Sequence, residues 1–266
     1  MRIFFLALWL SVALFARGAE EWQATLTPPQ PGNAPPLRPL KAQYEFGWAA
    51  LSAATADFEF SKVKGNQMRL AVKAKTTGAA RALWRMDTDH TAYCDSTTLR
   101  PIRLEQKEVY KGKTETAKVT FTRDYLERWR ETLPLPPGES PPKTRKVKLA
   151  DVFDLQSALL FVRSQRLANG DKIRLIVYPG KSAYLAEVEV LGRENVKVAG
   201  KNYPAIKCQL RLQGITKELT LEPHTKFKQA FAWLSDDNDR LLLKAKADIF
   251  IGSVWAEMTS VKFPEK

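Results

Sequence analysis

Residues 56–75 read ADFEFSKVKGNQMRLAVKAK, and this stretch decides the fold class. Apolar side chains occupy every second position on both sides of Gly65-Asn66, with mostly polar side chains between them. A period of two predicts a half-buried β-strand, and a Gly-Asn pair between two such runs predicts an antiparallel hairpin. The sequence therefore indicates a protein built from β-strands.

The alternation continues outward from this hairpin over most of the chain. Upstream, Tyr44, Phe46 and Trp48 share one face. Residues 78–86 are expected to form one helical turn or a bulged crossing. Residues 133–146 hold five prolines and are expected to form a loop. Further strands are predicted at residues 88–94, 102–110, 115–122 and 125–131, and then at 171–178, 182–191, 195–198, 203–213, 216–221, 227–234, 241–251 and 253–263.

One stretch, DVFDLQSALLFVRSQRLANG at residues 151–170, has the spacing of an amphipathic helix. Asp151 is expected to cap its N-terminus, and Asn169-Gly170 to end it. Its apolar face must pack on a sheet and is expected to include Val152, Leu155, Leu159 and Val162. Many short strands around one helix predict a mostly β protein: a curved antiparallel sheet or barrel-like β domain with one principal covering helix.

The first 39 residues differ in composition from the rest. A basic start, an apolar run of 13 residues and small residues before Ala19 predict a signal peptide over residues 1–18. The alternative is an uncleaved anchor, but the run falls short of the about 20 residues that span a bilayer. Residues 19–39 hold six prolines and are expected to form a linker, which leaves residues 40–266 as a single antiparallel β domain. We expect an exported protein of the periplasm or cell envelope, without a transmembrane helix after cleavage.

The chain is basic, with 42 Lys and Arg against 29 Asp and Glu, a net charge of +13. Apolar residues make up 44% and charged residues 27%, which excludes wholesale disorder and a fibrous repeat. After export the available polyanions are envelope lipids and wall polymers, so we expect a lipid, a lipoprotein or an anionic envelope surface as partner, and no nucleic acid. The alternative is a solvated basic surface that has no dedicated partner. The oligomeric state stays open.

Cys94 and Cys208 are the only cysteines. In an exported protein they could form one disulfide bridge. Cys208 also lies next to Ile206 and Leu210 on the apolar face of an expected strand, where a free thiol packs well. The sequence leaves both alternatives open.

Few residues suggest catalysis or a cofactor. His90 and His224 are the only histidines, and neither a nucleophile elbow nor an H-E-x-x-H zinc motif occurs. The acidic run at residues 236–239 lacks the spacing of a calcium loop and indicates a solvated turn. We predict no catalytic residue, no metal ligand and no cofactor. A glycosidase-like carboxylate pair stays open, because such pairs form in space, and its candidates are Asp87, Asp89, Glu105 and Glu108.

Four segments resemble a known family: LKAQYEFGWAALSAATADFEF (40–60), KTTGAARALWRMDTDHTAYCDSTTLRPIRLEQKE (75–108), DVFDLQSALLFVRSQRLANGDKI (151–173) and AFAWLSDDNDRLLLKAKADIFIGSVWAEMTS (230–260). They resemble the exported-protein family catalogued as domain of unknown function 3108. The most specific pieces are DLQSA (154–158) with Arg163 and WLSDD (233–237) with Arg240. The resemblance implies an envelope protein with an antiparallel, barrel-like sheet, similar in outline to periplasmic lipid and lipoprotein carriers, and implies no established activity.

Three functions remain open. The first is a non-enzymatic binding or carrier-like module for an apolar or amphiphilic envelope component. The second is a structural or assembly factor that docks through its basic face, and the third is an envelope hydrolase. For the first, aromatic side chains would line an apolar concavity and arginines would meet an anionic headgroup. The alternative for the helix arginine is that it pins the helix to the sheet. The predicted ligand-binding residues are Trp48, Trp84, Arg163, Trp233 and Arg240.

Overall fold

The computed structural model describes residues 22–135, 138, 142–224 and 229–264. The expected signal peptide, residues 1–18, lies outside them. The helices are η1 (Gln23–Thr25, a 3-10 turn), α2 (Gly78–Leu83) and α3 (Leu155–Ser164). The strands are β1 (Leu40–Trp48), β2 (Leu51–Val63), β3 (Gln67–Thr76), β4 (Met86–Asp95), β5 (Pro101–Tyr110), β6 (Lys113–Phe121), β7 (Tyr125–Leu133), β8 (Lys143–Lys148), β9 (Val152–Phe153), β10 (Lys172–Val177), β11 (Tyr184–Val198), β12 (Lys201–Ile215), β13 (Leu221–Pro223), β14 (Gln229–Ser235), β15 (Leu242–Asp248) and β16 (Ser253–Lys262).

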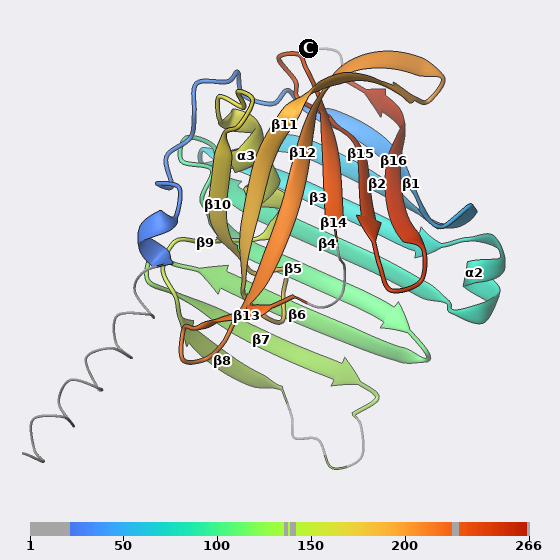
Figure 1. Cartoon of the computed structure of the whole chain (residues 1–266). Helices are drawn as coiled ribbons and strands as arrows, with labels where there is room; N and C mark the ends of the chain where they lie inside the picture. Colours follow the sequence, from blue (N-terminus) through green and yellow to red (C-terminus); the bar gives the residue numbers. More distant parts are fainter. Residues whose placement is uncertain (1–21, 136–137, 139–141, 225–228, 265–266) are drawn as a thin grey trace, which may run out of the picture.

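All sixteen strands of the described chain belong to one sheet that curls into a barrel-like roll (Figure 1). The hydrogen-bonded order is β8-β7-β6-β5-β4-β3-β2-β1-β16-β15-β14-β12-β11-β10-β9, with β13 paired to β12. Neighbours are antiparallel apart from the short β9, which runs parallel to β10. The expected mostly β fold, a curved antiparallel sheet with one principal helix, is confirmed.

The hairpin predicted from residues 56–75 is formed by β2 and β3. Phe60 lies opposite Leu70, and both side chains are buried. Gly65 and Asn66 close the hairpin with φ angles of 78° and 57°, in the left-handed region that these two residue types tolerate best. The two-residue period therefore sets which side chains point into the roll.

The two ends of the sheet overlap instead of pairing. Ile176 of β10 packs in one apolar cluster with Leu104, Val119 and Leu126 from β5, β6 and β7. Single hydrogen bonds add to this packing, such as that from the Gln106 side-chain amide to the carbonyl of Pro179 at 3.0 Å. In the described chain, side-chain packing rather than a strand ladder closes this seam.

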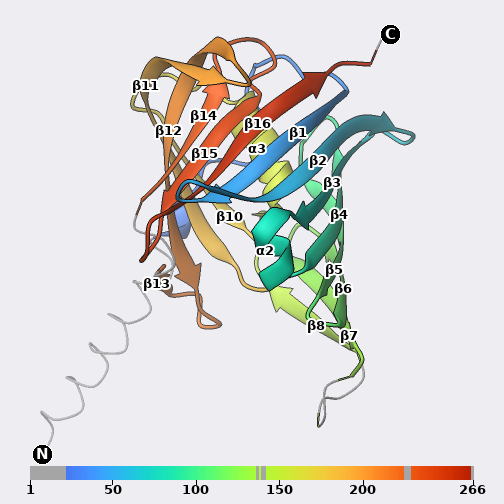
Figure 2. The same ribbon diagram turned by 90° about the vertical axis from the view of Figure 1, so that its right-hand side faces the viewer.

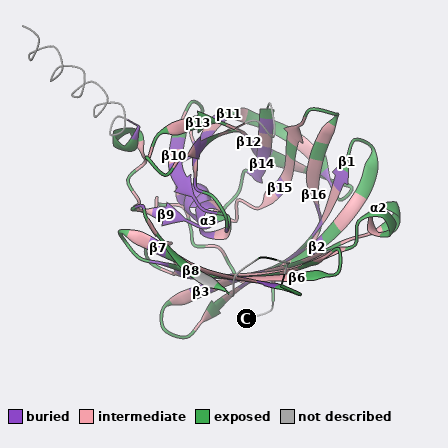
Figure 3. Ribbon diagram, turned by 90° about the horizontal axis from the view of Figure 1, so that it is seen from below, coloured by how far each residue is buried: buried purple, intermediate pink, exposed green. Residues whose placement is uncertain are grey.

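Helix α3 lies inside the roll (Figure 3). Phe161 packs against core residues of β10, β11 and β12, while Leu160 packs with Leu70 and Cys94 of β3 and β4. Because sheet surrounds the helix, most of its length is buried. The helix therefore fills one part of the interior and leaves the remaining inner face of the sheet without a covering helix.

The helix begins later and ends earlier than the sequence predicted. Residues 152–153 pair with β10 as β9, so Asp154 caps the helix in place of Asp151. Leu155, expected on the apolar face, is exposed. The helix ends at Ser164, before the Asn169-Gly170 pair that was expected to end it. The pairing of residues 152–153 with the sheet outweighs their helical spacing.

Residues 22–39 lie along the domain rather than reaching away from it as a linker. Trp22 is buried, and its indole N–H donates to the carbonyl of Leu219 at 2.8 Å. The N–H of Thr27 donates to the carbonyl of Arg174, and the N–H of Ala34 to that of Ser164. Proline-rich chain is free to pack in this way once its few donors find partners on the domain.

Two smaller elements complete the comparison with the sequence. The helical turn expected within residues 78–86 is α2. Residues 143–148, expected within a loop, form β8 and extend the sheet beyond β7. A loop prediction based on the prolines missed the charged strand that follows them.

Candidate functional site

The most buried polar group of the fold is at the start of α3. The Asp154 carboxylate accepts the N–H groups of Gln156 (2.8 Å) and Ser157 (3.0 Å) and the Ser157 hydroxyl (2.6 Å). Burial raises the pKa of Asp154, while these bonds act in the opposite direction. The DLQSA motif thus supplies a helix cap that holds α3 in the apolar interior.

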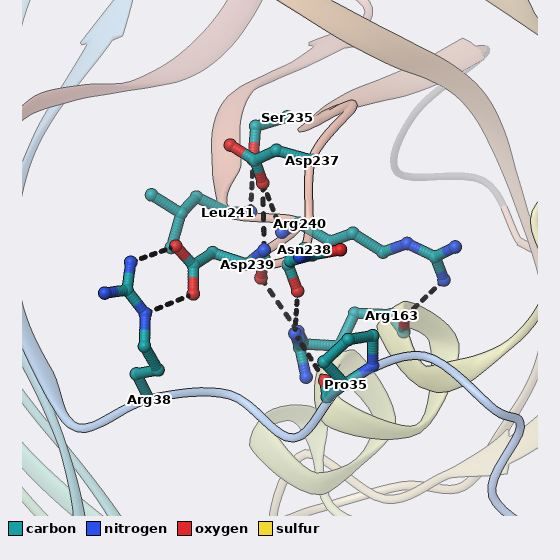
Figure 4. Close-up of polar contacts among 9 residues, drawn as sticks. All are labelled: Pro35, Arg38, Arg163, Ser235, Asp237, Asn238, Asp239, Arg240 and Leu241. Carbon is teal, nitrogen blue, oxygen red and sulfur yellow. Dashed lines mark hydrogen bonds and ion pairs between the residues drawn. The ribbon is translucent and has the colours of Figure 1, made fainter.

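Arg163 and Arg240, two of the predicted ligand-binding residues, lie together between α3 and the turn that joins β14 to β15 (Figure 4). The Arg163 guanidinium donates to the carbonyl oxygens of Asp239 (3.0 Å), Asn238 (3.1 Å) and Pro35 (3.2 Å). Burial, together with the charge of Arg240, lowers the pKa of Arg163 to about 10. These contacts fit the alternative in which this arginine pins the helix to the sheet.

Arg240 reaches in the opposite direction, to the end of α3. Its guanidinium donates to the carbonyl of Arg163 (2.7 Å), to that of Gln165, and to that of Arg166 (3.2 Å). The last carbonyls of a helix carry partial negative charge, so a cation is stabilised there. The Asp237 carboxylate accepts two backbone N–H groups of its own turn, which fixes the position of Arg240. The two family motifs therefore meet in one structural anchor.

The structure does not bring the predicted tryptophans to these arginines. Trp233 is buried, and its indole N–H donates to the Glu194 carboxylate at 2.6 Å. Trp48 and Trp84 are exposed near turns at the edge of the roll, with Lys111 Nζ 4.1 Å from the Trp84 ring centroid. The structure thus brings Arg163 and Arg240 together and places the three tryptophans elsewhere.

Cys94 and Cys208 are both free thiols in the structure. They belong to different apolar clusters, one on the β3–β4 side of α3 and the other on the β10–β12 side. Burial raises the pKa of Cys94 to about 12 and that of Cys208 to about 11. Neither thiol has the lowered pKa of a nucleophile.

The inner face of the sheet beyond α3 is lined on one side by alanines. One cross-strand row runs from β1 to β14. Phe46 of β1 lies opposite Ala256 of β16, and Ala245 of β15 lies between Ala256 and Ala232 of β14. Directly opposed residues of antiparallel strands point to the same side of a sheet. Ala232 is opposed to the core residue Cys208, so this row faces inward. We call the following residues the alanine wall: Ala230, Ala232, Ala245, Ala247 and Ala256.

Across the roll, the inner face of β4–β7 carries charged side chains. The His90 ring contacts the Glu108 carboxylate at 3.1 Å. The Arg130 guanidinium donates one hydrogen bond of 2.6 Å to the Glu115 carboxylate and makes a second ion-pair contact with it, also at 2.6 Å. The Tyr110 hydroxyl donates to the same carboxylate at 3.3 Å. Register places these residues on the face that carries the core residues of β4–β7. We call the following residues the inner polar cluster: His90, Glu108, Tyr110, Glu115, Arg128 and Arg130.

Cations exceed carboxylates near Glu115. Arg128 lies 3.9 Å from the carboxylate that Arg130 already holds, and Arg145 of β8 is the cross-strand partner of Arg128. Burial acts to raise the pKa of Glu115, but the hydrogen bond and charge of Arg130 outweigh it, so that pKa lies below its ordinary value. The buried Nε of Arg128 has no hydrogen-bond partner among the described residues. The cluster thus offers a guanidinium donor to an anion.

The inner polar cluster contains two carboxylates on neighbouring strands, the arrangement that a hydrolytic pair would need. Glu108 and Glu115 are directly opposed on β5 and β6. Each is engaged by a base, since Glu108 contacts His90 and Glu115 holds Arg130. A general acid needs a raised pKa, whereas the pKa of Glu115 is lowered. Both carboxylates therefore already contact another side chain of the cluster.

Sequence reasoning named His90 and Glu108 but missed Glu115, Arg128 and Arg130. The signal was present in the alternation, because these charged residues occupy the positions that share a face with apolar core residues of β6 and β7. A charge at an inward position indicates either a buried ion pair or an inner face that meets water.

Two surface clefts lie outside the inner face. One of about 440 Å³ is beside the turns that follow β4 and β6, and one of about 400 Å³ is beside the anchor of α3. Within the described residues, no group of three metal-ligating side chains gathers. None of the helices in that part of the chain has the length and apolar character to cross a bilayer.

The sequence profile of the family described as "Protein of unknown function (DUF3108)" matches residues 43–259. The chain belongs to the DUF3108 family. No curated protein sequence matches this DUF3108 chain. Its fold is similar to a crystal structure of a beta-barrel-like protein of domain of unknown function DUF1849 from Brucella abortus, with a TM-score of 0.60 and 10% identity over 86% of this chain and 99% of that chain. At this identity the likeness shows the fold alone.

Two weaker structural similarities are to a proposed exported protein and a proposed lipoprotein. One is to a proposed exported protein with a YmcC-like fold from Bacteroides fragilis, with a TM-score of 0.33 and 8% identity over 87% of this chain and 99% of that chain. The other is to a proposed lipoprotein from Parabacteroides distasonis, with a TM-score of 0.34 and 7% identity over 88% of this chain and 99% of that chain. At these TM-scores neither likeness supports a functional conclusion for the DUF3108 chain.

Proposed function

We propose that this DUF3108 protein is a non-enzymatic, carrier-like module of the cell envelope that binds an amphiphilic component within its rolled sheet. The observation that carries the proposal is the division of the inner face into the alanine wall and the inner polar cluster. A molecule with an apolar chain and an anionic head meets a suitable surface on each side. Export, expected from the signal peptide, would bring the protein to such molecules.

The alanine wall suits an apolar chain. Ala245, Ala247 and Ala256 face inward yet are only half-buried, so solvent reaches them. Small side chains leave room beside the sheet, and covering apolar surface gains about 25 cal/mol per Å². An acyl chain would displace water from this wall without requiring the fold to rearrange.

The inner polar cluster suits an anionic head. Arg128 lies 3.9 Å from the Glu115 carboxylate, and its Nε is an unused donor among the described residues. Arginine pairs with carboxylates and phosphates through forked hydrogen bonds that are stronger than neutral ones. A phosphate or carboxylate of the ligand would give the Arg128 guanidinium a second anion.

The proposal is tested by titrating the protein with lysophosphatidylglycerol and by mass spectrometry of lipids extracted after detergent-free purification. Ala245→Phe fills the inner face and is expected to weaken binding by at least about tenfold. The matched control is Lys246→Phe, which adds the same ring one residue along on β15, where the side chain is exposed and points to the other face. Equal affinity of both variants would remove the inner face as the binding surface.

The headgroup is tested separately. Arg130→Gln is expected to weaken binding of lysophosphatidylglycerol while leaving binding of the zwitterionic lysophosphatidylcholine unchanged, because only the former carries a net charge. Melting temperatures of all variants confirm that they are folded. A lipid-free extract together with no binding of either lipid would favour a structural or assembly factor over a carrier.

A further inference from the structure

The β1–β2 turn, α2 and the β15–β16 turn lie on one side of the roll (Figure 2), and they carry the most exposed apolar side chains of the described residues. Phe250 is 89% exposed and Leu83 is 88% exposed, while Leu51 and Ile251 are each 64% exposed. They come from the β1–β2 turn, the α2–β4 connection and the β15–β16 turn, which are far apart in sequence. We call the following residues the apolar rim: Trp48, Leu51, Leu83, Trp84, Phe250 and Ile251. Single exposed apolar residues need no explanation, but a contiguous group marks an interaction surface.

Hydrogen bonds hold the turns of the apolar rim together. The Trp48 indole N–H donates to the carbonyl of Ile251 at 2.8 Å, and the Trp255 indole N–H donates to that of Ala49 at 2.9 Å. Trp255 also packs on Gly47, where a β-carbon would come within 2.3 Å of its ring. These contacts join the β1–β2 turn to the β15–β16 turn and fix both in place.

The remaining turns are joined to the first pair. The N–H of Thr77, just before α2, donates to the carbonyl of Ala53 on β2 at 2.9 Å. Lys111, in the β5–β6 turn, places its ammonium over the ring of Trp84. The apolar tips are therefore carried by a connected frame rather than by independent loops.

Cations exceed carboxylates at this edge. Residues 49–51, 78–86, 111–113 and 249–252 hold four cations, and the carboxylates that flank them are Asp87, at the start of β4, and Asp248, which pairs with Lys246. The cations are Arg81, Arg85, Lys111 and Lys113, and the side chain of Arg85 is 76% exposed. Asp87, at the start of β4, pairs with the two arginines. The two lysines are exposed and lie beside the apolar tips.

We propose that the apolar rim docks the protein on the surface of a bilayer that contains anionic phospholipid. Apolar tips on projecting turns enter the boundary between headgroups and acyl chains, while neighbouring lysines meet the phosphates. Tryptophans whose indole N–H is satisfied beside an apolar ring face are typical of this boundary. Each basic residue near an anionic surface adds to the attraction, so charge and apolar contact act together.

Docking in this orientation has a further use. Tyr110 and Glu115 of the inner polar cluster lie at the β5–β6 end of their strands, the same end that carries Lys111. The membrane would therefore face the end of the roll at which the inner polar cluster begins. Rim docking does not depend on the proposed carrier function, because it requires no ligand inside the roll.

The proposal is tested in the full chain with a polarity-sensitive fluorophore at the rim. Phe250→Cys provides the attachment site, since the native thiols of Cys94 and Cys208 are buried. The control is Leu191→Cys, on β11 away from these turns and also exposed. Vesicles of phosphatidylethanolamine with phosphatidylglycerol are expected to shift the emission of the label at position 250 to the blue and to leave the label at position 191 unchanged.

Charge is tested in the same labelled protein. Lys111→Gln with Lys113→Gln is expected to raise the lipid concentration for a half-maximal shift by at least about fivefold. Three results would overturn the proposal: no shift at position 250, the same shift at positions 250 and 191, or equal responses to phosphatidylglycerol and phosphatidylcholine vesicles. A label at position 250 that responds to an envelope protein but to no vesicle would assign the rim to a protein partner instead.

Discussion

Replacing Arg163 with Met tests whether this arginine holds the fold together. Its guanidinium makes three hydrogen bonds of 3.0 to 3.2 Å to backbone carbonyls, and the residue is only 4% exposed. Hydrogen bonds from a charged donor contribute about 1.5 kcal/mol each at the lower end of their range, or about 4.5 kcal/mol for three. Burying a cation carries a cost that Met avoids, so we expect Arg163→Met to lower the free energy of unfolding by about 3 kcal/mol.

The assay is urea unfolding followed by circular dichroism. With a slope of about 3 kcal/mol per M, the midpoint should fall by about 1 M. Arg166→Met is the matched control, since Arg166 is on the same short segment but its side chain is 79% exposed in an ion pair with Asp171. Its midpoint should not change. If both variants unfold at the same urea concentration, the three carbonyl contacts contribute nothing and the anchor interpretation is wrong.

Two further predictions concern thiols and pH. Cys94 and Cys208 are buried free thiols, so without reductant the native protein should react with less than one equivalent of a thiol reagent. The urea-unfolded protein should react with two equivalents. If the unfolded protein reacts with none, the two cysteines form a disulfide bridge. The pKa of Glu115 is lower in the folded protein than in the unfolded chain. Its pairing with Arg130 therefore stabilises the protein at pH values above 4.5, the ordinary pKa of a glutamate, and this contribution is lost as the pH falls through the pKa of the folded state. The stability difference between the wild type and Glu115→Gln should therefore be constant near neutral pH and shrink in acid, and a difference that does not vary with pH would contradict this.

Alternation in the sequence was sufficient to predict the strands of the first half of the roll. It predicted less well where two strands merge, because the segments expected at 182–191 and 195–198 form the single strand β11. A bulge between Val190 and Gly192 shifts the register there, so the alternation breaks although the strand continues. Residues 216–221 also differ, since β13 begins only at Leu221. A bulge and a turn have similar local composition, and only pairing with a neighbour distinguishes them.

Contacts between distant parts of the chain could not be predicted from the sequence, either for the helix or for the inner face. Helical spacing extended to Val152, but this residue finds a partner in β10, more than twenty residues later in the chain. In the same way, Arg130 could not be assigned to Glu115 before the register of β6 and β7 was known. The contacts of a motif residue such as Arg163 likewise depend on chain segments as distant as Pro35.

The overlapping ends of the sheet give this fold a mechanical property that a closed barrel lacks. A closed barrel has to break a row of backbone hydrogen bonds before its circumference can increase. Here the order of strands starts at β8 and stops at β9, and apolar side chains such as Leu126 and Ile176 fill the joint between the two ends. Separating the two layers would break side-chain contacts and leave every strand ladder intact, and the three residues between β8 and β9 limit how far the two ends can move apart.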